Sequence, residues 1–322
     1  MEDAILVTGV DSRFFLMACL LHQSLKSTAF AKKFFVLDFG LKQDEKAFFK
    51  AKGILVEAPV MAGAHPWALK AMLYDYVAGL PPATNIIWID SDIFVSRNFS
   101  SALSALLDGM AGTDTAVAAS PEMTFGDVID RFAHLNLWPF IRAQTARKIP
   151  FTADYYNSGF IIFRAMGLLK QWSDLAKSTP FHQLFDQNIF NLLLHDGVRV
   201  QALPRNMWNF HAGDFDAGEG DPLVVHVTSD RAAHHYTVYE CGFAGRPGRD
   251  YELRLLTNRH FLGRQFALLQ EFVSSERATL AASHLIPADW PEGRFFITWN
   301  IPGDQACPCQ SGKPYERCHG SA

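Results

Sequence analysis

The stretch NIIWIDSDIFV, residues 85–95, places Asp-Ser-Asp directly after a run of apolar residues that shows no polar alternation. A strand with this pattern is covered on both faces, as in an α/β sheet. Because side chains of extended chain repeat every two residues, Asp90 and Asp92 project to the same side, just past the carboxyl end of the strand. Ligands of open α/β sheets bind at that edge, so the stretch predicts both a fold class and a site.

Predicted strands and helices alternate along the chain. Apolar runs without helical period predict strands, and runs with a 3.6-residue period that end at Gly or Pro predict helices. This order predicts an α/β fold, with a doubly wound, mostly parallel sheet and helices on both faces. The predicted strands cover residues 4–10, 33–40, 54–59, 85–95, 115–120, 158–165 and 223–229, and the predicted helices cover 14–25, 42–53, 66–82 and 186–197.

Composition excludes several classes of protein. The 322 residues, 49% hydrophobic and 19% charged, are enough to bury a large core. The formal net charge of -4 gives no basic footprint, so we expect no nucleic-acid partner. The first residues are acidic where a secretory signal is basic, and no run reaches the ~18 apolar residues of a membrane span. We therefore expect a cytoplasmic protein without a membrane span.

Asp90 and Asp92 offer two carboxylates on one side of a strand end. Hard divalent cations such as Mg²⁺ or Mn²⁺ prefer oxygen ligands and often share them with substrate phosphates. The alternative is that Asp and Ser cap a helix or fill a turn. Ile93, Phe94 and Val95 favour the metal site, because a plain turn does not return at once to buried apolar residues.

The segment IIWIDSDIFV resembles the DxD motif of the GT-A nucleotide-sugar glycosyltransferases. Three later segments are similar to the glycogenin-like and galactosyltransferase-like branch of these enzymes. YYNSGFIIFRA resembles its Asn-Ser-Gly strand, FDQNIFN its Asp-Gln helix start, and ALPRNMWNFH with VVHV its late Leu-Pro, Trp-Asn and His elements. The segments follow the family's order over residues 4–230, and this order is more specific than any single motif.

The resemblance implies a retaining transfer of a hexose from a UDP-sugar or similar donor. Asp90 and Asp92 are implied to bind Mn²⁺ or Mg²⁺ on the donor diphosphate, with His226 as third ligand. His226 also ends an apolar run, which places it at the same sheet edge, although a lone His on an apolar strand is more often a core residue. The implied contacts of the reacting sugar are Asp186, Gln187 and Asn157, and those of the nucleotide are Thr8, Gly9, Asp11 and Ser91. The alternative for Asp186 and Gln187 is to cap their helix.

The chain departs from this branch after His226. The branch follows its late His with Gly and then with Lys-Pro-Trp, which reaches the donor phosphates, whereas HVTSDRAAHHY contains neither. Arg231 is one substitute, because a guanidinium offers two parallel donors to phosphate. Lys70, on the predicted helix before the DxD strand, is a second candidate. The alternative for both is a solvated surface charge.

The segment CPCQSGKPYERCHG is a second, separate signal. A CxC pair followed by Cys-His gives four ligands of the number and type found in closed tetrahedral Zn²⁺ sites. The segment resembles the SEC-C motif over essentially its whole length. The resemblance implies a small structural zinc module that contacts a protein partner, with Cys307, Cys309, Cys318 and His319 as ligands.

These signals predict three parts: a GT-A-like catalytic domain at 1–240, a helical extension and loop at 241–300, and a zinc-binding tail at 301–322. Residues 251–286 are predicted to form one long or two short amphipathic helices. The predicted function is a metal-dependent glycosyltransferase acting on a glycan, lipid-linked or protein acceptor. Two alternatives stay open: a phosphatase of the haloacid dehalogenase type, which also ends an apolar strand in Asp-x-Asp, and a non-catalytic adaptor with a degenerate transferase fold.

Overall fold

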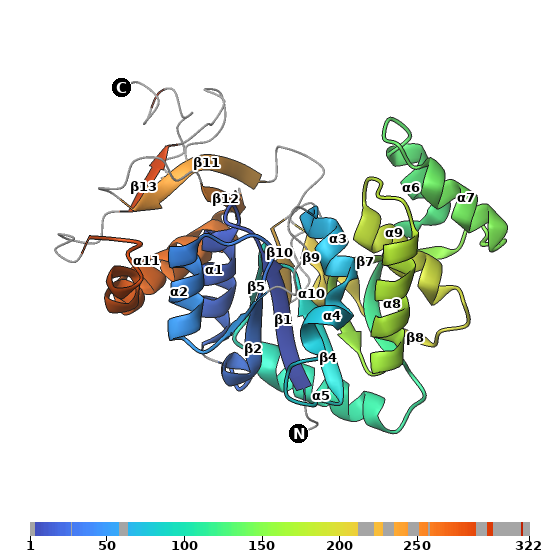
Figure 1. Cartoon of the computed structure of the whole chain (residues 1–322), viewed down its shortest axis with the longest axis horizontal. Helices are drawn as coiled ribbons and strands as arrows, with labels where there is room; N and C mark the ends of the chain where they lie inside the picture. Colours follow the sequence, from blue (N-terminus) through green and yellow to red (C-terminus); the bar gives the residue numbers. More distant parts are fainter. Residues whose placement is uncertain are drawn as a thin grey trace.

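The computed structural model describes residues 4–26, 28–57, 64–211, 222–227, 235–243, 251–256, 258–287, 295–298 and 317. The predicted zinc ligands Cys307, Cys309, Cys318 and His319 lie outside these residues, as does Arg231. Within the described part, strands and helices alternate along the chain, as Figure 1 shows.

Seven strands form the central sheet: β1 (Ala4–Val10), β2 (Phe34–Asp38), β3 (Leu55–Val56), β4 (Asn85–Ile89), β6 (Val117–Thr124), β7 (Asp154–Phe163) and β8 (Val200–Ala202). Their order across the sheet is β3-β2-β1-β4-β7-β6-β8. Only β7 is antiparallel to its neighbours within this sheet. The predicted mostly parallel sheet is confirmed. Because β7 runs the opposite way, its first residues lie at the edge where β1 and β4 end.

The side chains of β4 alternate between two cores. Ile87 and Ile89 pack on the face covered by α1 (Phe15–Leu25), α2 (Gln43–Ala51) and α5 (Phe99–Ala111). Ile86 and Trp88 pack on the opposite face, which is covered by α3 (Pro66–Ala71), α4 (Leu73–Val77), α8 (Met166–Ser178) and α9 (Phe185–Leu194). All four side chains are buried, and burial of each stabilises the fold by about 1.5–3 kcal/mol. Helices thus cover both faces, as predicted, although the helix expected at 66–82 is divided at Met72 into α3 and α4.

A second sheet of three strands lies beyond the DxD segment. It contains β5 (Ile93–Val95), β9 (Phe210–His211) and β10 (Val224–His226), in the order β5-β10-β9. His226 pairs with Ile93 on one side and with His211 on the other. The strand predicted near 223–229 therefore forms, but it pairs with the apolar residues that follow Asp92 instead of joining the central sheet.

The prediction of helix throughout 251–286 is wrong for its first residues. Residues Tyr251–Leu256 form strand β12, which joins β11 (His235–Phe243) and β13 (Phe295–Thr298) in a third sheet. Tyr251, Leu253 and Leu255 alternate with polar residues and are buried, which is the period of a strand. Helix α11 (Arg259–Ala282) starts where the Asn258 side chain accepts the His260 N–H at 3.0 Å.

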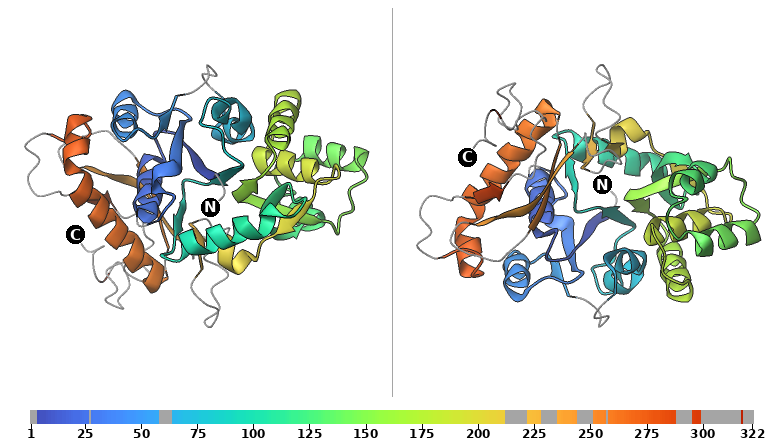
Figure 2. Two further views of the ribbon diagram at one scale, coloured as in Figure 1. Left: turned by 90° about the horizontal axis from the view of Figure 1, so that it is seen from below. Right: turned by 90° about the horizontal axis from the view of Figure 1, so that it is seen from above.

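The C-terminal elements pack directly on the central domain. Figure 2 shows α11, in orange, beside α1, in blue, and β12 also contacts α1. Strand β11 runs across residue 240, the expected end of the catalytic domain. The expected division at 240 is therefore spanned by a continuous strand.

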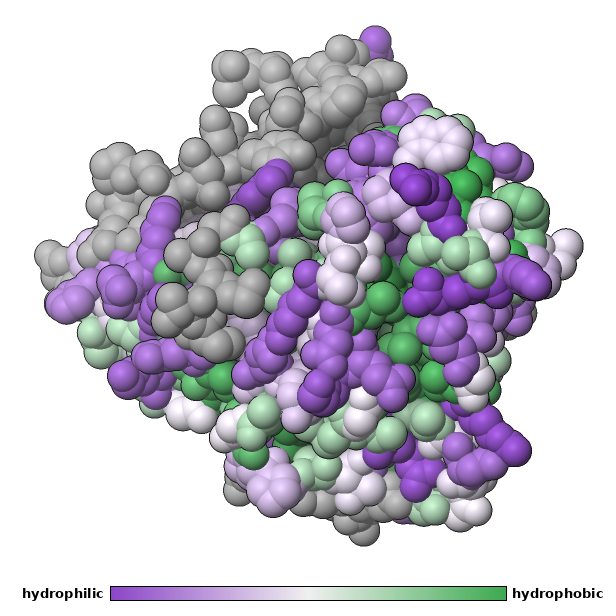
Figure 3. All heavy atoms as spheres, turned by 45° about the vertical axis from the view of Figure 1, so that its right-hand side comes forward, coloured by the Kyte–Doolittle hydropathy of each residue, from purple (hydrophilic) through white to green (hydrophobic). Residues whose placement is uncertain are grey.

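The remaining helices are α6 (Phe125–Arg131), α7 (Trp138–Ala146) and α10 (Arg205–Trp208). Among the described residues, no helix is long and apolar enough to cross a membrane. The face drawn in Figure 3 mixes hydrophilic residues with small hydrophobic areas.

Candidate active site

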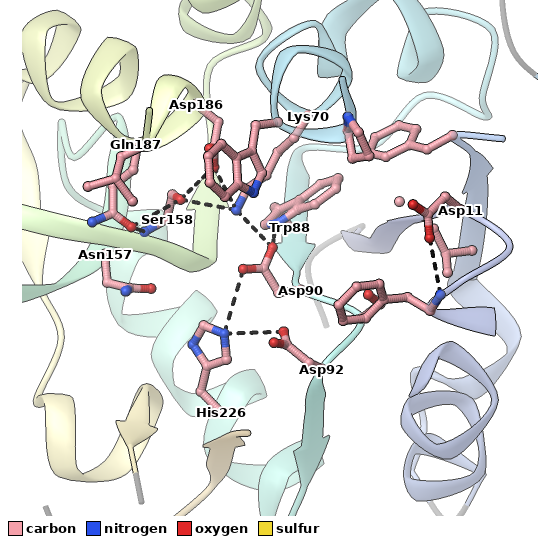
Figure 4. Close-up of a pocket in the computed structure, with 18 of the residues that line it drawn as sticks. Asp11, Lys70, Trp88, Asp90, Asp92, Asn157, Ser158, Asp186, Gln187 and His226 are labelled. Atoms are coloured by element: carbon pink, nitrogen blue, oxygen red, sulfur yellow. Dashed lines mark hydrogen bonds and ion pairs between the residues drawn. The ribbon is translucent and has the colours of Figure 1, made fainter. Parts of the chain in front are cut away.

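A cavity of about 540 Å³ opens at the edge of the central sheet where β1 and β4 end and β7 begins. Figure 4 shows side chains from α3, the β4–β5 turn, β7, α9 and β10 converging on it. Thr8, which was expected to contact the nucleotide, is fully buried and does not line it. The other predicted residues within the described part do line it: Gly9, Asp11, Lys70, Asp90, Ser91, Asp92, Asn157, Asp186, Gln187 and His226.

Asp90, Asp92 and His226 form one cluster in this cavity. Nε2 of His226 lies 3.2 Å from Oδ1 of Asp92 and 3.7 Å from Oδ2 of Asp90. One ligand atom from each of the three residues lies within 4.8 Å of the others. The cluster offers two of the carboxylate oxygens that Mg²⁺ and Mn²⁺ prefer, together with one imidazole nitrogen.

Asn209 fixes the orientation of the His226 ring. Its amide oxygen lies 3.0 Å from Nδ1 of His226 and accepts the proton on that nitrogen. Nε2 is the nitrogen that faces the two carboxylates. Such a hydrogen bond to the distal nitrogen is what orients metal-binding histidines.

Gly159 makes room for the ring. A Cβ atom at this position would lie 2.4 Å from Cε1 of His226 and 2.7 Å from its Nδ1. The same atom would lie 2.9 Å from Oδ1 of Asn157. The glycine of the Asn-Ser-Gly segment is therefore required by the close approach of His226 to β7.

Each DxD carboxylate uses one oxygen for a neighbouring cation and turns the other toward His226. Oδ1 of Asp90 accepts hydrogen bonds from Nζ of Lys70 at 2.8 Å and from Nε1 of Trp88 at 2.6 Å. Oδ2 of Asp92 accepts from Nη1 of Arg254 at 2.7 Å. Burial alone raises the pKa of Asp92, but His226 and Arg254 outweigh it and hold that pKa below its ordinary value. Asp92 is therefore ionised and able to bind a cation.

Lys70 joins the metal cluster to the other half of the cavity. Its ammonium lies 2.8 Å from Asp90, 3.0 Å from Oδ2 of Asp186 and 3.0 Å from Oγ of Ser158. Burial lowers the pKa of Lys70, but the two carboxylates outweigh burial and raise it above its ordinary value. Lys70 is thus a buried, charged residue that holds Asp90 and Asp186 in fixed positions, and the interpretation as a solvated surface lysine is wrong.

Asp186 and Gln187 lie in the first turn of α9 and contact the start of β7. Oγ of Ser158 donates to Asp186 at 2.9 Å, and the Ser158 N–H donates to Oε1 of Gln187 at 3.1 Å. The helix follows Leu184, whose φ of 55° is left-handed. Backbone strain of this kind is common at functional sites.

Glu122, at the end of β6, connects the predicted sugar-binding residues. Its Oε2 accepts from Nδ2 of Asn157 at 2.9 Å and from Nε2 of Gln187 at 3.3 Å. The amide groups of Asn157 and Gln187 are thereby oriented by one carboxylate on the cavity wall. Sequence reasoning missed Glu122, since a single Glu in a strand carries no motif.

Aromatic residues shape the end of the cavity that lies beside β1. A Cβ at Gly9 would lie 2.0 Å from the Phe39 ring, so the glycine allows that ring to reach the cavity. Phe39 stacks on Trp88 with 6.2 Å between ring centroids. Asp11 accepts the Phe14 N–H at 3.1 Å and so shapes the turn after β1.

Comparisons with known proteins agree with this fold. The structure of the galactosyltransferase LgtC in complex with donor and acceptor sugar analogues matches with a TM-score of 0.51 and 15% identity, over 85% of this chain and 99% of that one. The bifunctional glycosyltransferase WbbM matches with a TM-score of 0.50 and 16% identity, over 71% of this chain and 46% of that one. The chain has a GT-A-like fold.

The model of the SEC-C motif matches residues 305–321, which contain the four predicted zinc ligands. Comparison of the sequence with curated proteins finds no match. The identities to the solved structures are low, so these likenesses describe the fold.

Proposed function

We propose that the protein is a metal-dependent glycosyltransferase that transfers a hexose, with retention, from a UDP-sugar or similar donor. The observation that carries the proposal is the cluster of Asp90, Asp92 and His226 in a cavity of a GT-A-like fold. LgtC and WbbM, whose folds are similar, are both named as glycosyltransferases. The acceptor is a glycan, a lipid-linked intermediate or a protein.

The three cluster residues would hold Mn²⁺ or Mg²⁺, which neutralises the charge that builds on the departing diphosphate. Lys70 binds both Asp90 and Asp186 and holds them in fixed positions. The sugar would lie between the metal cluster and α9. Asn157 and Gln187, which Glu122 orients, would contact the sugar hydroxyls. Gly9, Asp11 and Ser91 line the cavity and would contact the nucleotide.

The tail is proposed as a separate structural module. Cys307, Cys309, Cys318 and His319 bind Zn²⁺, and the folded tail contacts a protein partner. The match of the SEC-C model to residues 305–321 supports this proposal.

Donor hydrolysis tests the proposed function. Wild-type protein is incubated with a panel of UDP- and GDP-sugars in Mn²⁺, and release of nucleoside diphosphate is measured, with ¹H NMR of the first-formed sugar anomer to test retention. Release by wild type that is abolished in Asp92→Asn supports the proposal. Asp114→Asn, an exposed carboxylate paired with Arg199, is the matched control and should behave as wild type.

Two outcomes would replace the proposal by an alternative. Hydrolysis of phosphate monoesters without release of nucleoside diphosphate would favour the phosphatase. Absence of donor binding and of turnover across the panel would favour the adaptor.

A further inference from the structure

The cavity wall is rich in carboxylates. Among the described residues that line it, six are acidic and only Arg13, Lys70 and Arg254 are cationic. A nucleoside diphosphate carries several negative charges, so its binding depends on where these three cations point. The acidic residues are Asp11, Asp90, Asp92, Glu122, Asp186 and Glu252.

Lys70 is already committed to the protein. An ammonium has three N–H donors, and Nζ of Lys70 has three acceptors within 3.0 Å, on Asp90, Ser158 and Asp186. The side chain is 8% exposed. Contact with a donor phosphate would require Lys70 to give up one of these buried partners.

Arg254, on β12, lies directly beside the metal cluster. Its Nη1 is 2.7 Å from Oδ2 of Asp92, on the carboxylate oxygen that does not face His226. The guanidinium lies 4.8 Å from the centroid of the Phe14 ring and lines the cavity, with 25% of the side chain exposed. A cation held by the cluster would bind Oδ1 of Asp92, the oxygen that faces His226. A phosphate group that binds this cation would then lie next to the Arg254 guanidinium.

A row of alternating charges holds Arg254 in place. Its Nε donates to Oε1 of Glu252 at 2.7 Å, and Oε2 of Glu252 lies 2.6 Å from Nη2 of Arg13. The Glu252 side chain is 3% exposed, and each of its two oxygens contacts an arginine. Burial and these two contacts together fix its position. Arg254 is thus oriented before any ligand arrives, which lowers the cost of binding.

We propose that Arg254 is the cation that contacts the diphosphate of the donor, and that it also orients Asp92. A guanidinium suits this role because its planar fork of donors matches phosphate oxygens. The residue comes from β12, so the C-terminal extension is part of the active site. This inference rests on the proposed function, and it assigns the phosphate contact to a residue other than Lys70 or Arg231.

Calorimetry with UDP at saturating Mn²⁺ tests the proposal. Arg254→Gln should weaken UDP binding by about 10- to 100-fold, the range for hydrogen bonds to charged groups. Arg254→Lys keeps the charge without the fork and should fall between Arg254→Gln and wild type. Arg199→Gln removes an exposed arginine paired with Asp114 and is the matched control, with unchanged affinity. Glu252→Gln, which keeps the shape of the anchor, should also weaken binding.

Thermal unfolding in EDTA shows whether each variant is folded before ligand is added. UDP affinity of Arg254→Gln within twofold of wild type would overturn this inference alone. If Arg254→Gln does not fold, unchanged affinity in both Arg254→Lys and Glu252→Gln would overturn it equally. Failure of wild type to bind UDP or any other nucleoside diphosphate would overturn the proposed function as well, so the two failures are distinguishable.

Discussion

Gly159→Ala tests whether His226 is a metal ligand. The added Cβ would lie 2.4 Å from Cε1 of His226, whereas ordinary contacts begin at 3.4 Å, so the ring must move by about 1 Å. Movement of the backbone instead would break the hydrogen bond in which the Gly159 carbonyl accepts the Asp90 N–H at 2.8 Å. A shift of this size removes Nε2 from a metal–ligand bond of about 2.0–2.2 Å. It also breaks the hydrogen bond from Nδ1 to Asn209.

We expect the dissociation constant for Mn²⁺ to rise by about 10- to 100-fold. We expect the free energy of unfolding to fall by about 1–3 kcal/mol, the usual cost of overpacking. Titration of Mn²⁺ followed by electron paramagnetic resonance measures the first quantity, and urea unfolding in EDTA measures the second.

Gly167→Ala is the matched control, because a Cβ at this exposed position in α8 meets nothing within 4 Å. It should leave Mn²⁺ binding unchanged. Wild-type affinity for Mn²⁺ in Gly159→Ala would refute the reasoning, since it would mean that the cation does not depend on the position of His226.

Two further predictions concern the charges of the cavity and the tail. Lys70→Met leaves Asp90 and Asp186 without their buried cation and should lower the free energy of unfolding by about 3–5 kcal/mol, measured by urea denaturation. The pKa of Lys70 is raised on folding, so the difference in free energy of unfolding between wild type and Lys70→Met should be constant near neutral pH. This difference should shrink only as the pH rises above the ordinary lysine value of 10.5. A difference that shrinks near pH 7 would contradict the interpretation of Lys70 as a buried, charged residue. Purified wild-type protein should contain one tightly bound zinc per chain, and Cys309→Ser should lose it while UDP still stabilises the protein in Mn²⁺; zinc-free wild type by metal analysis would refute the tail site.

The strand at 85–89 and its acidic end could be predicted because both signals are local. An unbroken apolar run followed by Asp-Ser-Asp predicts a doubly covered strand that ends at the sheet edge. The alternation argument for the two carboxylates is wrong, because residues 91 and 92 form a turn in which the Asp90 carbonyl accepts the Ile93 N–H at 3.2 Å. Both carboxylates nevertheless line the cavity. His226 was predicted at the same edge from the end of its own apolar run, although it reaches the site through a second sheet.

The partners of these residues could not be predicted, because they come from distant parts of the chain. Arg254 follows Asp92 by 162 positions, and the helical period predicted over residues 251–286 includes YELRLL in the helix that follows it. The alternation of Tyr251, Leu253 and Leu255 was the signal for a strand, and it would have placed Glu252 and Arg254 together on the opposite face. Trp88 is the exception among these partners, because it is only two residues from Asp90 and a buried indole N–H needs an acceptor.

Thermal unfolding with UDP or another nucleoside diphosphate, in Mn²⁺ and in EDTA, tests the central claim most directly. A ligand at 100 times its dissociation constant stabilises the folded state by about 2.7 kcal/mol. If the cation held by Asp90, Asp92 and His226 bridges to the diphosphate, this stabilisation should appear in Mn²⁺, disappear in EDTA and be absent from Asp92→Asn in either condition. Equal stabilisation in EDTA and in Mn²⁺ would contradict the account.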